Sequence, residues 1–170
     1  MAFAQCRECT QEVSDEAQAC PHCGAPFPSN RSFHGWGYEY KSATTILGYP
    51  FVHVAIGRDA RGRLRVAKGF IAVGQFAVGA ITIAQFGIGF LFGLGQFVLG
   101  LAVVAQFAGA LAFGLGQFAA GYVAIGQFAV GEYVMASAGW GRYLWSPQIK
   151  DPHAVDLFRT LAMKLGLWPR

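Results

Sequence analysis

Four cysteines near the start of the chain are the residues best suited to chemistry. They form two C-x-x-C pairs, Cys6/Cys9 and Cys20/Cys23, with ten residues between the pairs. Each pair can place two thiolates on one tight turn, and two such turns supply the four sulfur ligands of a tetrahedral zinc site. Because four sulfurs leave no open position, the spacing predicts one Zn²⁺ with a structural role.

The surroundings of the cysteines are acidic. Residues 1–26 contain four carboxylates and one arginine, Arg7. Phosphate contacts need Lys and Arg, so we do not expect this segment to bind nucleic acid. His22 lies between two cysteines, and we interpret it as a solvated turn residue because four sulfurs already complete the site.

The second cysteine pair, CPHCG, resembles the short zinc ribbons found at the N-termini of many prokaryotic proteins. The resemblance covers about residues 1–26 and implies a fold unit without an activity. The first residues show no secretory signal, so we expect the ribbon to be cytoplasmic, where thiols bind metal more often than they form disulfides.

The charges of the chain lie outside its middle. Between Gly69 and Gly131 there is no Lys, Arg, Asp, Glu or His, so the net charge of +4 belongs to the flanks. A basic cluster from Arg58 to Lys68 precedes this uncharged segment, and Trp140, Tyr143 and Trp145 follow it. Such a distribution suits anionic headgroups at one end and a membrane interface at the other.

The uncharged segment is repetitive. Small residues recur every five positions, with two six-residue steps at 89–95 and 110–116, and FGLGQF at 92–97 returns at 113–118. Large and small apolar residues alternate between them, which is strand geometry. We therefore predict a β-solenoid with four short sides and about 21 residues per coil. Gly93 and Gly114 would be bulges at its corners, with positive φ angles.

The alternation also predicts which side chains face inward. Large residues such as Phe76 and Phe97 are expected inside, and small ones such as Ala77 and Ala119 outside. The exterior would lack charge, which indicates a membrane or a partner surface. Stacking of such coils would arrange the glutamines in two ladders, one of Gln75, Gln96 and Gln117 and one of Gln85, Gln106 and Gln127.

The repeats resemble the pentapeptide-repeat class. The whole chain also resembles uncharacterised bacterial proteins in which a zinc ribbon precedes apolar, glycine-rich repeats. These resemblances imply a β-solenoid fold and carry no activity.

The expected organisation is mainly β with four parts. These are a zinc ribbon at 1–26, a linker and aromatic docking segment at 27–46, the β-solenoid domain at 47–141, and a C-terminal cap at 142–170. The cap begins a helix at Asp151-Pro152 that continues to about Leu165 and is amphipathic.

No catalytic residues are predicted. The GxGxxA match at Gly114–Ala119 is a product of the repeat, and Ser137, His53 and His153 have no partners at readable spacing. We therefore expect a protein that is not an enzyme.

The function predicted from the sequence is that of a membrane-associated structural or adaptor protein displaying a cytoplasmic zinc ribbon. A stack of coils with four sides would be only ~17 Å tall, so we expect shallow insertion or two chains stacked end to end as a homo-oligomer. One alternative is a soluble oligomerising module whose ribbon recruits protein or nucleic acid. Another is a polytopic helical membrane protein.

Overall fold

The computed structural model describes residues 3–29, 36–59 and 62–167, so residues 30–35 of the linker and Arg61 of the basic cluster lie outside the described residues. The chain is mainly β, with one helix near its C-terminus. It divides into two units, residues 1–37 with 57–64 and residues 38–56 with 65–170. The elements are β1 (Phe3–Gln5), β2 (Glu12–Ser14), β3 (Trp36–Lys41), β4 (Thr45–Ile46), β5 (Tyr49–Pro50), β6 (Val52–Arg58), β7 (Val66–Trp145) and α1 (Pro152–Lys164).

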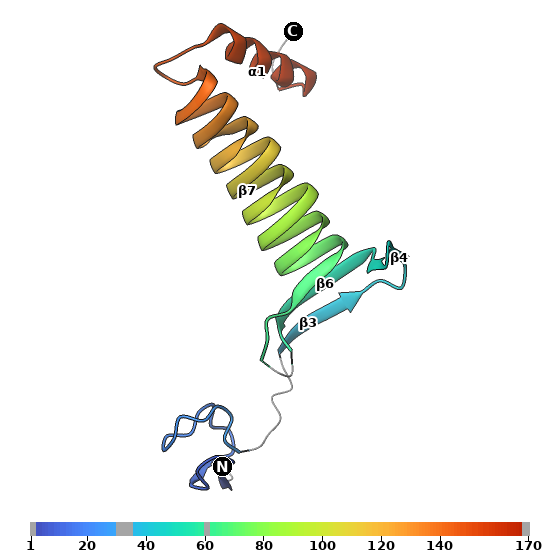
Figure 1. Ribbon diagram of the computed structural model, residues 1–170, viewed down its shortest axis with the longest axis vertical. Helices are drawn as coiled ribbons and strands as arrows, with labels where there is room; N and C mark the ends of the chain where they lie inside the picture. The colour runs from blue at the N-terminus through green and yellow to red at the C-terminus, as the bar shows by residue number, and fades with distance from the viewer. Residues whose placement is uncertain (1–2, 30–35, 60–61, 168–170) are drawn as a thin grey trace. The chain divides into compact units, whose positions relative to one another are not determined.

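Most of the second unit is β7, a continuous strand of 80 residues. Figure 1 shows this strand winding through successive stacked turns. Alternating large and small apolar residues favour extended backbone, and the absence of proline lets every turn hydrogen-bond to the next. The helical alternative for this segment is wrong, because residues 66–145 are strand. In the described part of the chain, no helix has both the length and the apolar character needed to cross a membrane.

Aromatic rings show how many residues make one turn of β7. Successive rings of one column lie 5.5, 5.3, 4.3 and 4.6 Å apart between centroids, and the residues are ten or eleven positions apart: Phe76, Phe86, Phe97, Phe107 and Phe118. On another column, Tyr122, Tyr133 and Tyr143 contact each other at the same steps. One turn of β7 therefore takes ten or eleven residues. The 21-residue period that relates FGLGQF at 92–97 to its copy at 113–118 covers two turns, so the predicted coil with four sides is wrong.

The interior of β7 is narrow. A Cβ atom at Gly87 would lie 2.6 Å from Cγ2 of Thr82, so residues five positions apart face each other across the interior. Only small and medium side chains fit there, and Thr82 satisfies its hydroxyl by donating to the carbonyl of Ile88 at 2.9 Å. The inward and outward assignment from the sequence is thus inverted. The buried residues of β7, glycines apart, are Ala67, Ala72, Ala77, Thr82, Ala84, Val98, Val103, Ala105, Ala108, Ala119, Ala124, Ala129, Val134 and Ala136.

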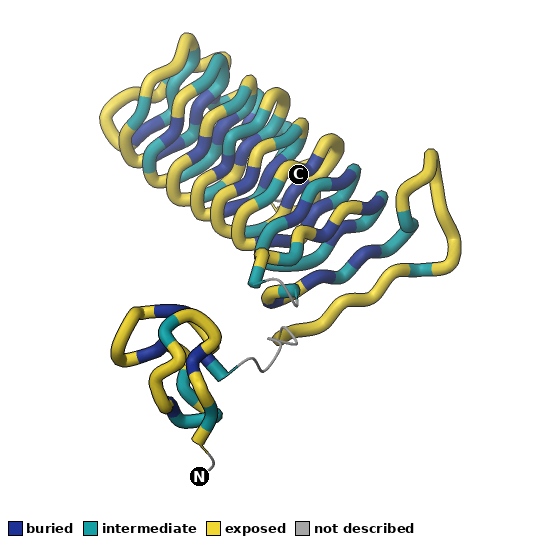
Figure 2. The backbone as a smooth tube through the Cα atoms, turned by 60° about the horizontal axis from the view of Figure 1, so that its bottom comes forward, coloured by how far each residue is buried: buried dark blue, intermediate teal, exposed yellow. Residues whose placement is uncertain are grey.

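The large apolar side chains of β7 lie on its outside. Figure 2, which is coloured by the burial of each residue, shows buried residues along the middle of the turns and exposed residues toward their edges. The exposed large side chains between residues 83 and 130 are Ile83, Phe86, Ile88, Phe90, Leu91, Phe92, Leu94, Phe97, Leu99, Leu101, Phe107, Leu111, Leu115, Phe118, Tyr122 and Val130. The outer wall of β7 is therefore more apolar than the sequence alone predicts.

The glycines Gly93 and Gly114 are needed for space. Among the described glycines of β7, none has a positive φ angle, so the corner explanation is wrong. A Cβ atom at Gly93 would collide with the side chain of Val98, and one at Gly114 would lie 2.9 Å from the carbonyl oxygen of Ala120. Both positions favour glycine because their surroundings are crowded.

Both ends of β7 are covered by other elements. At the start, β6 pairs with the first turn in parallel register, from Val52↔Ile71 to Ala55↔Gly74, and β3 follows in the sheet order β3-β6-β7. At the other end lies α1, which packs Phe158 against Trp145 with ring centroids 6.4 Å apart. The N-cap Asp151 accepts hydrogen bonds from the N–H groups of His153 and Ala154, as the Asp-Pro start predicts.

Candidate metal centre

The two cysteine pairs lie on two loops that are closed by the same pattern of backbone hydrogen bonds. Cys6 follows β1, which pairs with β2 in an antiparallel hairpin. Its N–H donates to the carbonyl of Gln11, and its carbonyl accepts from the N–H of Thr10, both at 2.8 Å. This loop therefore turns back on itself within five residues.

The second loop repeats these hydrogen bonds. The N–H of Cys20 donates to the carbonyl of Ala25 at 2.8 Å, and its carbonyl accepts from the N–H of Gly24 at 2.9 Å. The residue after the second cysteine of each pair has a positive φ angle, 61° at Thr10 and 76° at Gly24. Glycine takes this conformation without strain, whereas threonine does not.

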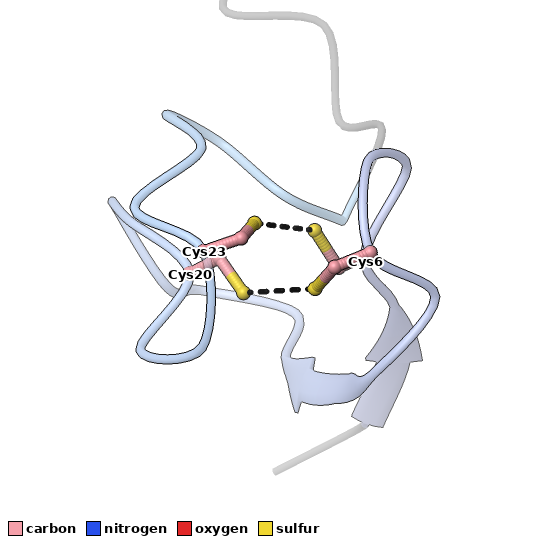
Figure 3. A group of neighbouring side chains, drawn as sticks. Cys6, Cys20 and Cys23 are labelled. Atoms are coloured by element: carbon pink, nitrogen blue, oxygen red, sulfur yellow. Dashed lines mark hydrogen bonds between the residues drawn. The ribbon is translucent and has the colours of Figure 1, made fainter.

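The four cysteine sulfurs come together between the two loops. All four lie within 4.8 Å of one another, and the closest pairs are Cys6–Cys23 at 3.8 Å and Cys9–Cys20 at 3.6 Å. Figure 3 shows the side chains of the two loops pointing toward a common centre. A tetrahedral metal with sulfur ligands at ~2.3 Å requires sulfurs ~3.8 Å apart, so the spacing fits zinc.

The ionisation of the thiols also fits a cation at this centre. The backbone N–H of Cys9 stabilises the Cys6 thiolate and lowers the pKa of Cys6 to about 7. At Cys23 the N–H of Ala25 acts in the same direction, but the neighbouring Cys9 sulfur and burial outweigh it and raise the pKa to about 12. Crowded thiols thus resist joint ionisation, and a positive ion would remove that resistance.

Within the described residues, only the four cysteines belong to the cluster of ligand atoms. His22 is exposed and is not among the clustered ligand atoms, in agreement with its interpretation as a turn residue. Arg7 forms an exposed ion pair with Glu8 at 3.6 Å.

The Gly114–Ala119 match lies inside β7 and is not followed by a helix, so it lacks the strand-to-helix turn of a dinucleotide site.

A polar cluster at the start of β7 was not predicted from the sequence. The Glu39 carboxylate binds Lys41 at 2.9 Å, the guanidinium of Arg65, and Nε2 of buried His53 at 3.3 Å. Nδ1 of His53 lies 2.8 Å from the backbone nitrogen of Lys68 and 3.1 Å from the carbonyl oxygen of the same residue. The Lys41 ammonium, with help from His53 and Arg65, holds the pKa of Glu39 below its usual value. Only the pairing of β3 with β6 reveals this cluster.

The glutamines of β7 form one row. They are spaced ten or eleven positions apart, as the phenylalanines are, and Gln106, Gln117 and Gln127 line one groove of about 890 Å³. The prediction of two separate ladders is therefore wrong. In the described residues, no hydrogen bond joins two of these amides.

Comparisons with known proteins give no relatives. No protein-family model, no curated protein and no solved structure matches this chain. The resemblances suggested by the cysteine and glycine motifs are therefore not supported beyond the cysteine cluster and the strand-rich region that follows it.

Proposed function

We propose that the protein is a non-enzymatic, membrane-associated structural or adaptor protein. In this proposal β7 is a β-solenoid with two sides and ten or eleven residues per turn. It carries a zinc ribbon, within residues 1–26, that is displayed on the cytoplasmic side for a protein partner.

The outer wall of β7 is the observation that carries this proposal. Large apolar side chains cover the turns between residues 83 and 130, and no Lys, Arg, Asp, Glu or His interrupts residues 69–131. Exposed apolar surface of such extent marks a membrane or a protein interface. Lipid suits a wall that is apolar over many turns, because an acyl-chain environment needs no matching shape.

The cysteine cluster supports the zinc ribbon. Two loops of equal backbone design present four sulfurs at spacings that match tetrahedral zinc. Four thiolates leave no open position for substrate, so the ion stabilises the fold of the loops and exposes their surface to a partner.

Fractionation of cells expressing the full chain tests the proposal. We expect the protein to pellet with membranes and to remain there after a high-salt wash, because apolar burial and not charge holds it. Recovery as a monomer in the aqueous fraction without detergent would contradict membrane association. Recovery as a detergent-free oligomer would instead support the soluble assembly module, whose copies bury the same wall against each other.

A further inference from the structure

The height of β7 bears on how it meets a membrane. We propose that a single β7 spans the hydrocarbon core of a bilayer with its winding axis along the membrane normal. The proposal rests on the membrane association argued above. It replaces both shallow insertion and end-to-end stacking of two chains.

The length of the uncharged segment matches the hydrocarbon thickness. At ten or eleven residues per turn, residues 69–131 make about six turns. Turns stack at the ~4.8 Å spacing of paired strands, so this segment is ~29 Å tall. The hydrocarbon core of a bilayer is ~30 Å thick. The height of ~17 Å expected from the sequence came from assigning two turns of β7 to a single coil.

Charged groups lie at both ends of this segment. Lys68 and Arg65 precede it, with Arg65 bound to Glu39. Just beyond the other end, Arg142 pairs with Glu132 at 3.3 Å. Charges at two levels ~30 Å apart coincide with the two headgroup regions, where ions remain hydrated.

The types of aromatic residue also differ between the middle and the ends of the uncharged segment. From Phe70 to Gly121 the aromatic side chains of β7 are all phenylalanine. Tyr and Trp concentrate at membrane interfaces because one part of each ring is apolar and one part is polar. The sequence thus carries two aromatic belts around an apolar middle. Exposed members of these belts are Tyr38, Tyr40 and Tyr49 at one end and Tyr122 and Trp140 at the other.

The backbone of a wound strand is compatible with lipid on its sides. Its N–H and C=O groups bond from turn to turn, and β6 covers the first turn while α1 lies against the last. Lipid therefore meets side chains, and unpaired backbone edges are kept out of the hydrocarbon. The glutamine row is polar, and no hydrogen bond joins its amides in the described residues; turns ~4.8 Å apart let neighbouring amides pair by side-chain rotation when water is excluded.

Polarised infrared spectroscopy of the full chain in oriented bilayers of dioleoyl phosphatidylcholine and phosphatidylglycerol tests the orientation. The main amide I transition of β-structure is polarised along the interstrand hydrogen bonds, which run from turn to turn. A spanning β7 absorbs more strongly for light polarised along the membrane normal. Stronger absorption in the membrane plane would show that β7 lies flat and would overturn the proposal.

A matched pair of lysine substitutions provides a second test. Leu99, Gly109, Ala120 and Val130 line one groove at steps of ten or eleven residues, and Trp140 continues the column. Leu99 is 59% exposed at the middle of the uncharged segment, and Trp140 is 70% exposed beyond its end. A spanning β7 puts these positions at different depths, whereas a flat one puts them at equal depth.

We expect Leu99→Lys to reduce partition into vesicles of dioleoyl phosphatidylcholine and phosphatidylglycerol by about a hundredfold. Trp140→Lys removes an indole of the aromatic belt but places the lysine at headgroup depth, so we expect it to reduce partition by less than about tenfold. Equal losses would overturn the spanning proposal and leave membrane association standing. If the unmodified chain does not float with vesicles at all, the proposed function itself fails. Both substitutions replace exposed side chains, and unchanged circular dichroism in detergent confirms that each variant folds.

Discussion

The inverted packing of β7 predicts opposite outcomes for the same substitution at two adjacent residues. Ala119 is 5% exposed and belongs to the buried cluster, whereas Ala120 is exposed. Replacing Ala119 with leucine adds three carbons to an interior in which residues five positions apart already face each other. Replacing Ala120 with leucine adds them to an outer column that already holds Leu99 and Val130.

The expected magnitudes follow from these surroundings. Overpacking a close-packed interior costs ~1–3 kcal/mol, and the limited space beside Gly114 favours the upper part of that range. A surface substitution changes the free energy of unfolding by less than ~0.5 kcal/mol. In urea, with a slope of ~2 kcal/mol per molar, Ala119→Leu should lower the unfolding midpoint by ~1 M and Ala120→Leu should leave it nearly unchanged.

The assay is urea unfolding of the detergent-solubilised chain, followed by circular dichroism at a strand wavelength. Equal midpoints for the two variants, or greater damage from Ala120→Leu, would refute the assignment of small residues to the interior. The outward assignment of Ala119 made from the sequence predicts no damage there, so the two assignments are directly opposed.

Three further predictions concern the metal centre and the polar cluster. Chelation should remove one Zn²⁺ per chain and unfold the cysteine loops while the amide I band of β7 stays unchanged; full zinc content after Cys20→Ser would contradict the four-sulfur site. Thr10 has a positive φ angle, so Thr10→Gly should relieve about 1 kcal/mol of backbone strain and raise zinc affinity about fivefold. Gly24→Ala introduces the same strain in the second loop and should lower zinc affinity by a similar factor. Competition with a chromophoric chelator measures both affinities. The pKa of Glu39 is lowered in the folded state, so this carboxylate stabilises the fold at pH values above its unfolded pKa, and the stabilisation is lost as the pH falls through the folded pKa. Glu39→Gln should therefore remove this loss of thermal stability at acid pH. A variant whose melting temperature depends on pH as that of the unmodified chain does would count against the cluster.

The metal centre could be predicted from the sequence because its determinants are local. Two C-x-x-C pairs specify two tight loops, and the hydrogen bonds that close these loops join residues only four or five positions apart. The N-cap of α1 is local in the same sense, since Asp151 and Pro152 act within one turn. Strand structure in the uncharged segment followed from the alternation of side-chain size.

The winding of β7 could not be obtained from that alternation. A period of two residues does not say which set of side chains faces inward, and the usual burial of large residues gave the wrong answer. Five-residue sides leave room only for residues such as Ala77 and Val98 inside. The 21-residue sequence period was also ambiguous. Two turns of ten and eleven residues give the same period as a single coil with four sides. The contact of Glu39 with His53 depends on strand pairing and had no local signal.

A distance measurement on β7 tests the turn length on which the height depends. Leu101, Leu111 and Tyr122 are all exposed; ten positions separate the first two, and Tyr122 follows Leu101 by the full sequence period. Nitroxide spin labels can be attached at these positions through an introduced amino acid that carries a ketone. This chemistry does not react with the four cysteines of the metal centre. We predict stronger dipolar broadening for the 101–111 pair, on adjacent turns ~4.8 Å apart, than for the 101–122 pair, two turns apart. Stronger broadening for the 101–122 pair would show that one turn takes up the full sequence period and would contradict this account of β7.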